Sequence, residues 1–310
     1  MKKQAFLIVL LFVLLFMTTL VFGENIQKNR IPADVDWLIH FDMDKFKTTS
    51  LFELLEKNEK NFKFRGKSDD LQRKFKIDIY NDIDGITVFG KGGDEDNTAV
   101  MISGNIDQKH LRSLLDFADD HEEEAYGQFT IHSWDDDEVG VFVDDHTILI
   151  SESQTTIKDT LDVISGKKQN ISSAPIMSYF KDISGDSFIA AVIDDISSLM
   201  KGSGPRILKQ SGRAFFTAWE KAQNLNLKLS LDVGSKEVAE NMQQVIKGMI
   251  AMANLYENET LKDLKLQDAI KIFQKDNTIQ MELTYPVEEL RSKALERKMK
   301  DLFQMSSLIH

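Results

Sequence analysis

Alternation of apolar and polar positions along the chain predicts an α+β protein made of short strands and helices. The clearest signal lies in residues 84–106, where two apolar runs flank a polar tip at 91–97. A glycine-bearing tip between two such runs is typical of a β-hairpin. Asp107 follows as the cap of a predicted helix. That helix places apolar residues at three- and four-residue steps on one face: Leu111, Leu114, Leu115 and Ala118.

Other segments follow the same two periodicities. Alternating segments predict further strands at 37–44, 128–134, 139–143, 147–151, 187–193, 214–221, 225–233, 268–274 and 278–284. Helical spacing predicts helices at 45–57, 153–164 and 194–200, and others that begin at Ser235 and Pro286. The helix after Ser235 is the longest and is expected to bury one stripe: Val238, Met242, Val245, Met249, Met252 and Tyr256.

The order of elements repeats, which predicts two similar halves. A strand at 36–44 opens the first, and a similar strand at 186–194 opens the second. In each half a helix, a hairpin, a helix, a hairpin and a helix follow. We therefore expect an α+β fold with halves at 34–166 and 186–310 and a linker at 167–185. Each half is expected to form a mostly antiparallel sheet with helices packed on one face. The pattern leaves open whether the two sheets pack together or join edge to edge.

The N-terminal segment has the pattern of a secretory signal peptide. Two lysines precede an uncharged apolar run at 5–22, and Gly23 is a small residue of the kind found at a cleavage site. We expect residues 1–23 to be removed and residues 24–33 to form a short polar tether. The run is nearly long enough to span a bilayer, so an uncleaved N-terminal anchor is the alternative. Either outcome predicts export, to the periplasm or the cell surface.

Composition narrows the choice of partners. The chain carries a net charge of −12 and has no cysteine. Phosphate contacts need clustered Lys and Arg, so this charge argues against nucleic acid as a partner and against general adhesion to anionic lipid. Without disulfides, an exported chain relies on its hydrophobic core for stability.

A short motif in the first hairpin resembles a group of exported bacterial proteins. Residues 82–88, DIDGITV, form a pattern in which an aspartate, an isoleucine and a glycine precede alternating apolar residues and a threonine. Together with the signal-peptide pattern and the opening strand, this motif is similar to bacterial exported proteins of uncharacterised function. The resemblance implies a location and duplicated α+β halves, and it implies no activity.

Acidic residues on the predicted turns are candidate calcium ligands. Ca²⁺ prefers carboxylate oxygens, and hairpin turns present them at the surface. The candidates are Asp94, Asp96, Asp135, Asp136, Asp137 and Glu138. The simpler interpretation is that these acids keep exposed turns soluble and protect the sheet edges. No other cofactor is expected.

Zinc is the second metal to consider. His110 and His121 could pair with Glu124 as ligands, because imidazole and carboxylate both bind zinc. The stretch that begins at His121 lacks the second histidine of an H-E-x-x-H motif. A solvated helix and loop is therefore the simpler interpretation of these residues.

The sequence contains no motif of a known catalytic class. It has no G-x-S-x-G, no cysteine nucleophile and no phosphate-binding loop. The main hypothesis is an exported, non-enzymatic binding or interaction protein of the bacterial envelope, whose partner is an unknown envelope protein or a small ligand. The alternative is a periplasmic metal-dependent hydrolase with a nonstandard site. Membrane contact is expected only through an uncleaved N-terminal segment or a basic C-terminal helix that contains Arg291, Lys293, Arg297, Lys298 and Lys300.

Overall fold

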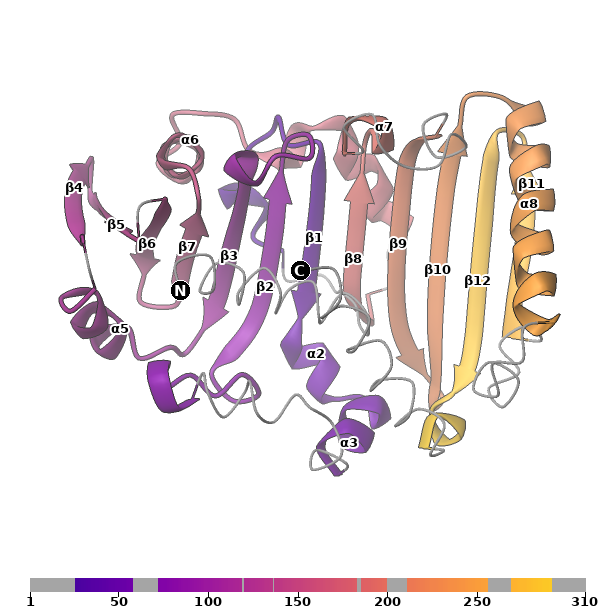
Figure 1. Ribbon diagram of the computed structural model, residues 1–310, viewed down its shortest axis with the longest axis horizontal. Coiled ribbons are helices and arrows are strands. Elements are labelled where there is room, and N and C mark those ends of the chain that lie inside the picture. Colours follow the sequence, from indigo (N-terminus) through magenta and orange to yellow (C-terminus); the bar gives the residue numbers. More distant parts are fainter. Residues whose placement is uncertain are drawn as a thin grey trace.

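One antiparallel sheet of twelve strands organises the part of the chain that the structure describes (Figure 1). The computed structural model describes residues 26–57, 72–118, 120–135, 137–182, 185–199, 211–255 and 269–291. The fold is α+β, as predicted. The predicted signal peptide and most of the predicted basic C-terminal helix lie outside the described residues. None of the helices within the described ranges combines the length and apolarity that a membrane span requires.

Within the described residues, the first half of the chain supplies seven strands. They are β1 (Trp37–Asp42), β2 (Ile83–Gly90), β3 (Thr98–Gly104), β4 (Glu122–Tyr126), β5 (Phe129–Trp134), β6 (Glu138–Asp144) and β7 (Thr147–Ser151). The second half supplies β8 (Ser187–Ile193), β9 (Ser211–Lys221), β10 (Asn224–Val233), β11 (Ile270–Lys275) and β12 (Thr278–Pro286). The predicted hairpin at 84–106 is confirmed as β2 and β3, which pair in antiparallel register.

The two predicted sheets join edge to edge through β1 and β8. These strands pair antiparallel, with Trp37 opposite Ile193 and Phe41 opposite Ile189. From this seam the strand order is β1-β2-β3-β7-β6-β5-β4 in one direction and β8-β9-β10-β12-β11 in the other. Counted outward from the seam, β1-β2-β3-β7-β6 of the first half correspond in order to β8-β9-β10-β12-β11 of the second. The β4–β5 hairpin then adds two more strands to the first half. Common ancestry of the halves stays a prediction.

Helices connect and cover the strands. The α-helices are α2 (Met43–Lys47), α3 (Ser50–Lys57), α5 (Gln108–Leu115), α6 (Gln154–Ile164), α7 (Ile196–Leu199) and α8 (Lys236–Leu255). Short 3₁₀ helices are η1 (Lys28–Arg30), η3 (Glu95–Asn97), η4 (Ile171–Ser173), η5 (Pro175–Asp182) and η7 (Val287–Arg291). The single helix expected at 45–57 is divided in two at Thr49, whose hydroxyl donates to Phe46 O and accepts from Phe52 N.

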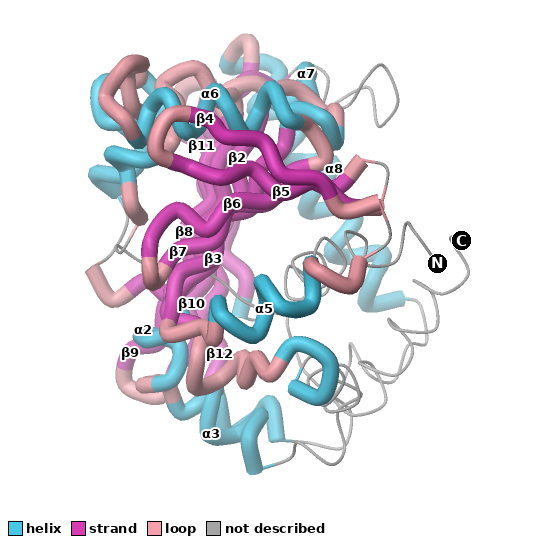
Figure 2. The backbone as a smooth tube through the Cα atoms, turned by 90° about the vertical axis from the view of Figure 1, so that its left-hand side faces the viewer, coloured by secondary structure: helices cyan, strands magenta, loops and turns pink. Residues whose placement is uncertain are grey.

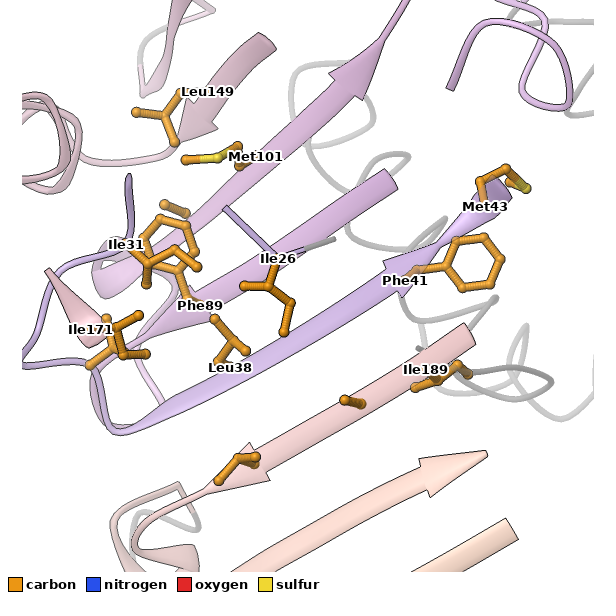
Figure 3. Packing of buried hydrophobic residues seen from close by; sticks show 14 of the residues in the cluster. Ile26, Ile31, Leu38, Phe41, Met43, Phe89, Met101, Leu149, Ile171 and Ile189 are labelled. Carbon is orange, nitrogen blue, oxygen red and sulfur yellow. The ribbon is translucent and has the colours of Figure 1, made fainter. Parts of the chain in front are cut away.

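The predicted tether and the predicted linker both contribute to the core. Ile31 and Ile171 are fully buried, and Ile171 N donates to Ile31 O at 2.8 Å. Figure 3 shows both side chains gathered close to Phe89. Arg30 forms a 2.6 Å ion pair with Asp144. Residues 26–33 therefore pack onto the first half instead of extending into solvent, because their two isoleucines are apolar enough to be buried.

Along the described part of α8, the buried positions agree only in part with the predicted stripe. Met242 is buried as expected, whereas Val245 is 47% exposed. Ala239 is fully buried and Ile246 packs beside it. Val238 packs against the same cluster, as predicted. The side chains of Met249 and Met252, and the whole of Tyr256, lie outside what the structure describes.

A carboxylate from the second half caps a helix of the first. Glu220, on β9, accepts hydrogen bonds from Ser50 N at 3.1 Å and Leu51 N at 3.0 Å, and from Ser50 Oγ at 2.7 Å. The first N–H groups of a helix have no partner inside the helix, and the helix dipole favours a negative charge there. Glu220 thus provides hydrogen-bond acceptors for the first N–H groups of α3, although it lies 170 residues away in the sequence.

We predict that Glu220→Ala lowers the free energy of unfolding by about 1–2 kcal/mol, the usual cost of losing a helix cap. Urea unfolding followed by circular dichroism measures this change. Glu56→Gln, an exposed change near the other end of the same helix, is the matched control and should shift stability by less than about 0.5 kcal/mol. Equal effects of the two substitutions would contradict the capping role.

A histidine is buried at the seam of the sheet. His40, on β1, is 2% exposed and its Nδ1 lies 2.8 Å from Thr87 Oγ1. Burial, followed by the charge of Lys45, lowers the pKa of His40 from 6.5 to about 3. The folded state therefore keeps His40 neutral at pH values where the unfolded chain is protonated. Its contribution to stability is complete above pH 6.5 and is lost as the pH falls from there toward 3.

We predict that wild-type stability falls below pH 6.5 and that His40→Gln reduces the slope. One proton taken up on unfolding changes the free energy of unfolding by about 1.4 kcal/mol per pH unit. Urea unfolding at intervals between pH 7 and pH 4 measures the slope, which carboxylate protonation also affects in the lower part of this range. His146→Gln, at an exposed turn, is the control and should keep the wild-type slope. An unchanged slope in His40→Gln would contradict this assignment.

Candidate functional site

An acidic edge strand builds the most distinctive group of side chains in the described residues. β4 carries Glu122, Glu123 and Glu124 and pairs with β5 through a two-residue turn at Gly127 and Gln128. Gly127 has a φ of +63°, which glycine adopts without strain. The sequence pattern contained no strand here, because consecutive glutamates are poor strand formers. Pairing with β5 overrides that preference, and the charges suit an edge that should not aggregate.

Three potential metal ligands meet on one face of this hairpin. Glu123 and His132 lie directly opposite each other in the β4–β5 ladder, and His121 immediately precedes β4. His121 Nε2 lies 3.1 Å from His132 Nδ1, and Glu123 Oε1 lies 3.4 Å from the same nitrogen. The two imidazole planes are inclined by 14°, and the rings meet edge to edge with centroids 5.4 Å apart. In the described part of the chain, this is the one group of three such residues whose ligand atoms all lie within 4.8 Å of one another.

His132 is the buried member of the group. Only 4% of its side chain is exposed, against 58% for Glu123. The ring of Phe142, from β6, meets the imidazole edge-on at 5.6 Å. Burial lowers the pKa of His132, and the positive charges of Arg112 and His121 add to that effect against the opposing charge of Glu123. The imidazole is therefore neutral near pH 7, the form in which histidine binds a metal.

Helix α5 supplies a cation on the other side of the same ring. Arg112 Nη1 lies 3.4 Å from His132 Nε2, and its guanidinium lies 4.0 Å from the centroid of the Phe142 ring. Asp107 caps α5 as predicted, by accepting from His110 N at 3.0 Å. Arginine can only donate, so His132 Nε2 is the acceptor and Nδ1 carries the proton.

The zinc prediction named one of these three residues. His121 belongs to the group, but Glu124 points to the opposite face of the sheet, where it forms an ion pair with Lys158 of α6 at 2.8 Å. His110 lies on α5, with its ring near Lys74 O. Figure 2 shows the strands of this end of the sheet running between α6 and α5. Neighbouring residues of a strand face opposite sides of the sheet. Because residues 122–126 form a strand, Glu123 and not Glu124 lies on the same face as His132.

Acidic residues of two predicted calcium turns influence Glu152. Burial raises the pKa of Glu152, and the charges of Glu95 and Asp96 in one turn and of Asp137 and Glu138 in the other add to that effect. The remaining candidates are Asp94, which precedes η3, Asp135, which has a φ of +51°, and Asp136, which lies outside the described residues. Glu138 is buried and accepts from Trp134 Nε1. Calcium at these turns stays a prediction.

The comparisons with known proteins identify a shared fold. No protein-family model matches the sequence, and no curated protein sequence matches it. Crystal form III of TP0453 superposes with a TM-score of 0.53 at 11% identity, covering 87% of this chain and 97% of that chain. Crystal form I of TP0453 gives 0.51 at 12% identity, covering 87% and 96%. At such low identity, this likeness establishes the α+β fold alone.

We predict that Glu152→Gln raises the free energy of unfolding at pH 7 by roughly 0.5 kcal/mol or less, because it removes the cost of burying the charge and the repulsion from the neighbouring carboxylates. A raised carboxyl pKa costs stability above the unfolded-state value of 4.5, so the gain should vanish below about pH 4. Urea unfolding at both pH values measures it. Glu122→Gln, on the exposed edge strand, is the charge-matched control. A loss of stability at pH 7 would contradict this interpretation.

Proposed function

We propose that this chain is an exported protein of the bacterial envelope that acts by binding a partner protein or a small ligand. The N-terminal apolar segment supports export, and the resemblance to exported bacterial proteins supports the location. The proposal depends above all on one structural observation, which is that the sheet ends in two unlike edge strands, β4 and β11. An exposed edge strand can bind a partner by adding one of the partner's strands to the sheet.

β11 has the features of a binding edge. Its burial alternates along its length, so Ile270 and Ile272 face inward while Lys271, Phe273 and Lys275 are exposed. Phe273 is 48% exposed, one of three large apolar side chains in the described residues with such exposure. Natural edge strands use lysine to limit indiscriminate pairing, and here two lysines flank an aromatic side chain. This combination suits a specific partner with an acidic or mixed strand.

β4 has the opposite character. Its five residues include three glutamates, and four of the five are exposed. Its charge disfavours pairing with another acidic chain. The two ends of the sheet therefore differ in charge, which would let a partner distinguish them.

We predict that a photo-crosslinking residue at position 273, in the tagged full-length protein in cells, captures a discrete partner. The same residue at position 117 is the matched control, because Phe117 is 86% exposed and belongs to the other half of the chain. Mass spectrometry identifies the crosslinked peptides, and the intact mass shows whether residues 1–23 are removed. Self-crosslinks alone, or equal capture from both positions, would count against a binding edge at β11.

The alternative function is a metal-dependent hydrolase of the periplasm. It is favoured by the group of His121, Glu123 and His132, because two histidines and one carboxylate bind zinc in several catalytic sites. Such a site leaves one coordination position for water. Metal-dependent turnover of a small ester or peptide substrate would favour this alternative over the binding function.

A further inference from the structure

We infer that His121, Glu123 and His132 form a binding site for one divalent transition-metal ion, with Zn²⁺ the expected ion. The first argument is geometric. Four ligands placed about 2.0–2.1 Å from zinc at the corners of a tetrahedron lie about 3.3 Å from one another. The two distances to His132 Nδ1, 3.1 Å and 3.4 Å, match that spacing. The third pair, His121 and Glu123, has its ligand atoms within 4.8 Å, so rotation of these two side chains would bring all three ligands around one ion.

The second argument is that the hairpin holds these ligands in place. Glu123 and His132 are fixed opposite each other by the antiparallel register, and His132 is packed against Phe142. His121 is held by the contact of its Nε2 with His132 Nδ1 at 3.1 Å. A bound ion would therefore clamp the segment before β4 to β5, and stabilise an edge strand that its own sequence disfavours.

The donor set decides between metals. Two imidazole nitrogens and one carboxylate suit Zn²⁺, whereas Ca²⁺ prefers six or more oxygen ligands. The exposed side of the site, where 58% of the Glu123 side chain is accessible, leaves a fourth position for water or for a side chain of a partner. The site is thus chemically distinct from the acidic turns around Glu152.

Arg112 competes with the metal. A metal on His132 Nδ1 requires the ring proton to be on Nε2, the nitrogen that faces Arg112 Nη1 at 3.4 Å. An N–H group cannot accept a hydrogen bond from arginine, so the contact and the bound metal exclude each other. The guanidinium also repels a cation. Metal binding should therefore turn Arg112 away from His132 and weaken the link between α5 and β5.

The test is a zinc titration of the full chain, purified in a mild detergent with a histidine-free tag. Competition with a chromophoric chelator measures the Zn²⁺ affinity, and the visible absorption of bound Co²⁺ reports four-coordinate geometry. We expect one ion per chain. Glu123→Gln and His121→Gln should each weaken binding at least about 10- to 100-fold. His132→Gln should abolish it, and the other two variants keep the test valid if this buried change prevents folding.

Two further variants distinguish this site from binding elsewhere. His110→Gln removes a histidine of the nearby helix that is not a ligand, and should leave the affinity unchanged. Arg112→Met keeps the apolar stem but removes the charge, and should tighten binding about 10-fold. Wild-type affinity in Glu123→Gln and His121→Gln, or an equal loss in His110→Gln, would overturn the site. Weaker binding by a folded Arg112→Met would overturn the competition. None of these outcomes depends on the partner-binding function of β11.

Discussion

The antiparallel pairing of β1 with β8 is the contact on which the rest of the structure depends. It joins residues 37–41 to residues 189–193 and turns two predicted sheets into one. Both strands lie at the centre of a sheet, so their backbone groups are paired on both sides and their side chains are largely buried. Burying a charged side chain costs far more than burying a neutral one, which explains why this seam holds His40 in its neutral form.

Contacts between segments far apart in sequence reinforce this seam. Glu220 of the second half caps α3 of the first, and Ile31 pairs with Ile171 across the first half. Because Glu220 lies in the second half, loosening that half also removes the cap of α3 in the first half. Stability is therefore shared along the sheet, while its two ends depend on fewer contacts. The proposed binding edge at β11 and the proposed metal site at β4 both lie at these ends.

The two ends meet different chemical demands. An open sheet needs protection at both edges, and the chain provides it with glutamates on β4 and lysines on β11. On β4 the same acidic side chains also offer a ligand to a cation, since Glu123 stands opposite a buried histidine. On β11 the exposed Phe273 offers a contact for a partner. Protection against aggregation and specific binding can thus arise from the same strands.

The sequence by itself determined the α+β class, the first hairpin, the capped helices α5 and α6, and most strands, because local periodicity and caps such as Asp107 and Ser153 act over a few residues. It also named His121 and the acidic turns as candidate ligands. Only the tertiary structure decided that the two sheets join, that residues 26–33 pack into the core and that Glu123 and His132 accompany His121. These outcomes depend on which distant strands pair and on which face of the sheet each residue occupies. Neither is specified by composition or by the local spacing of residues.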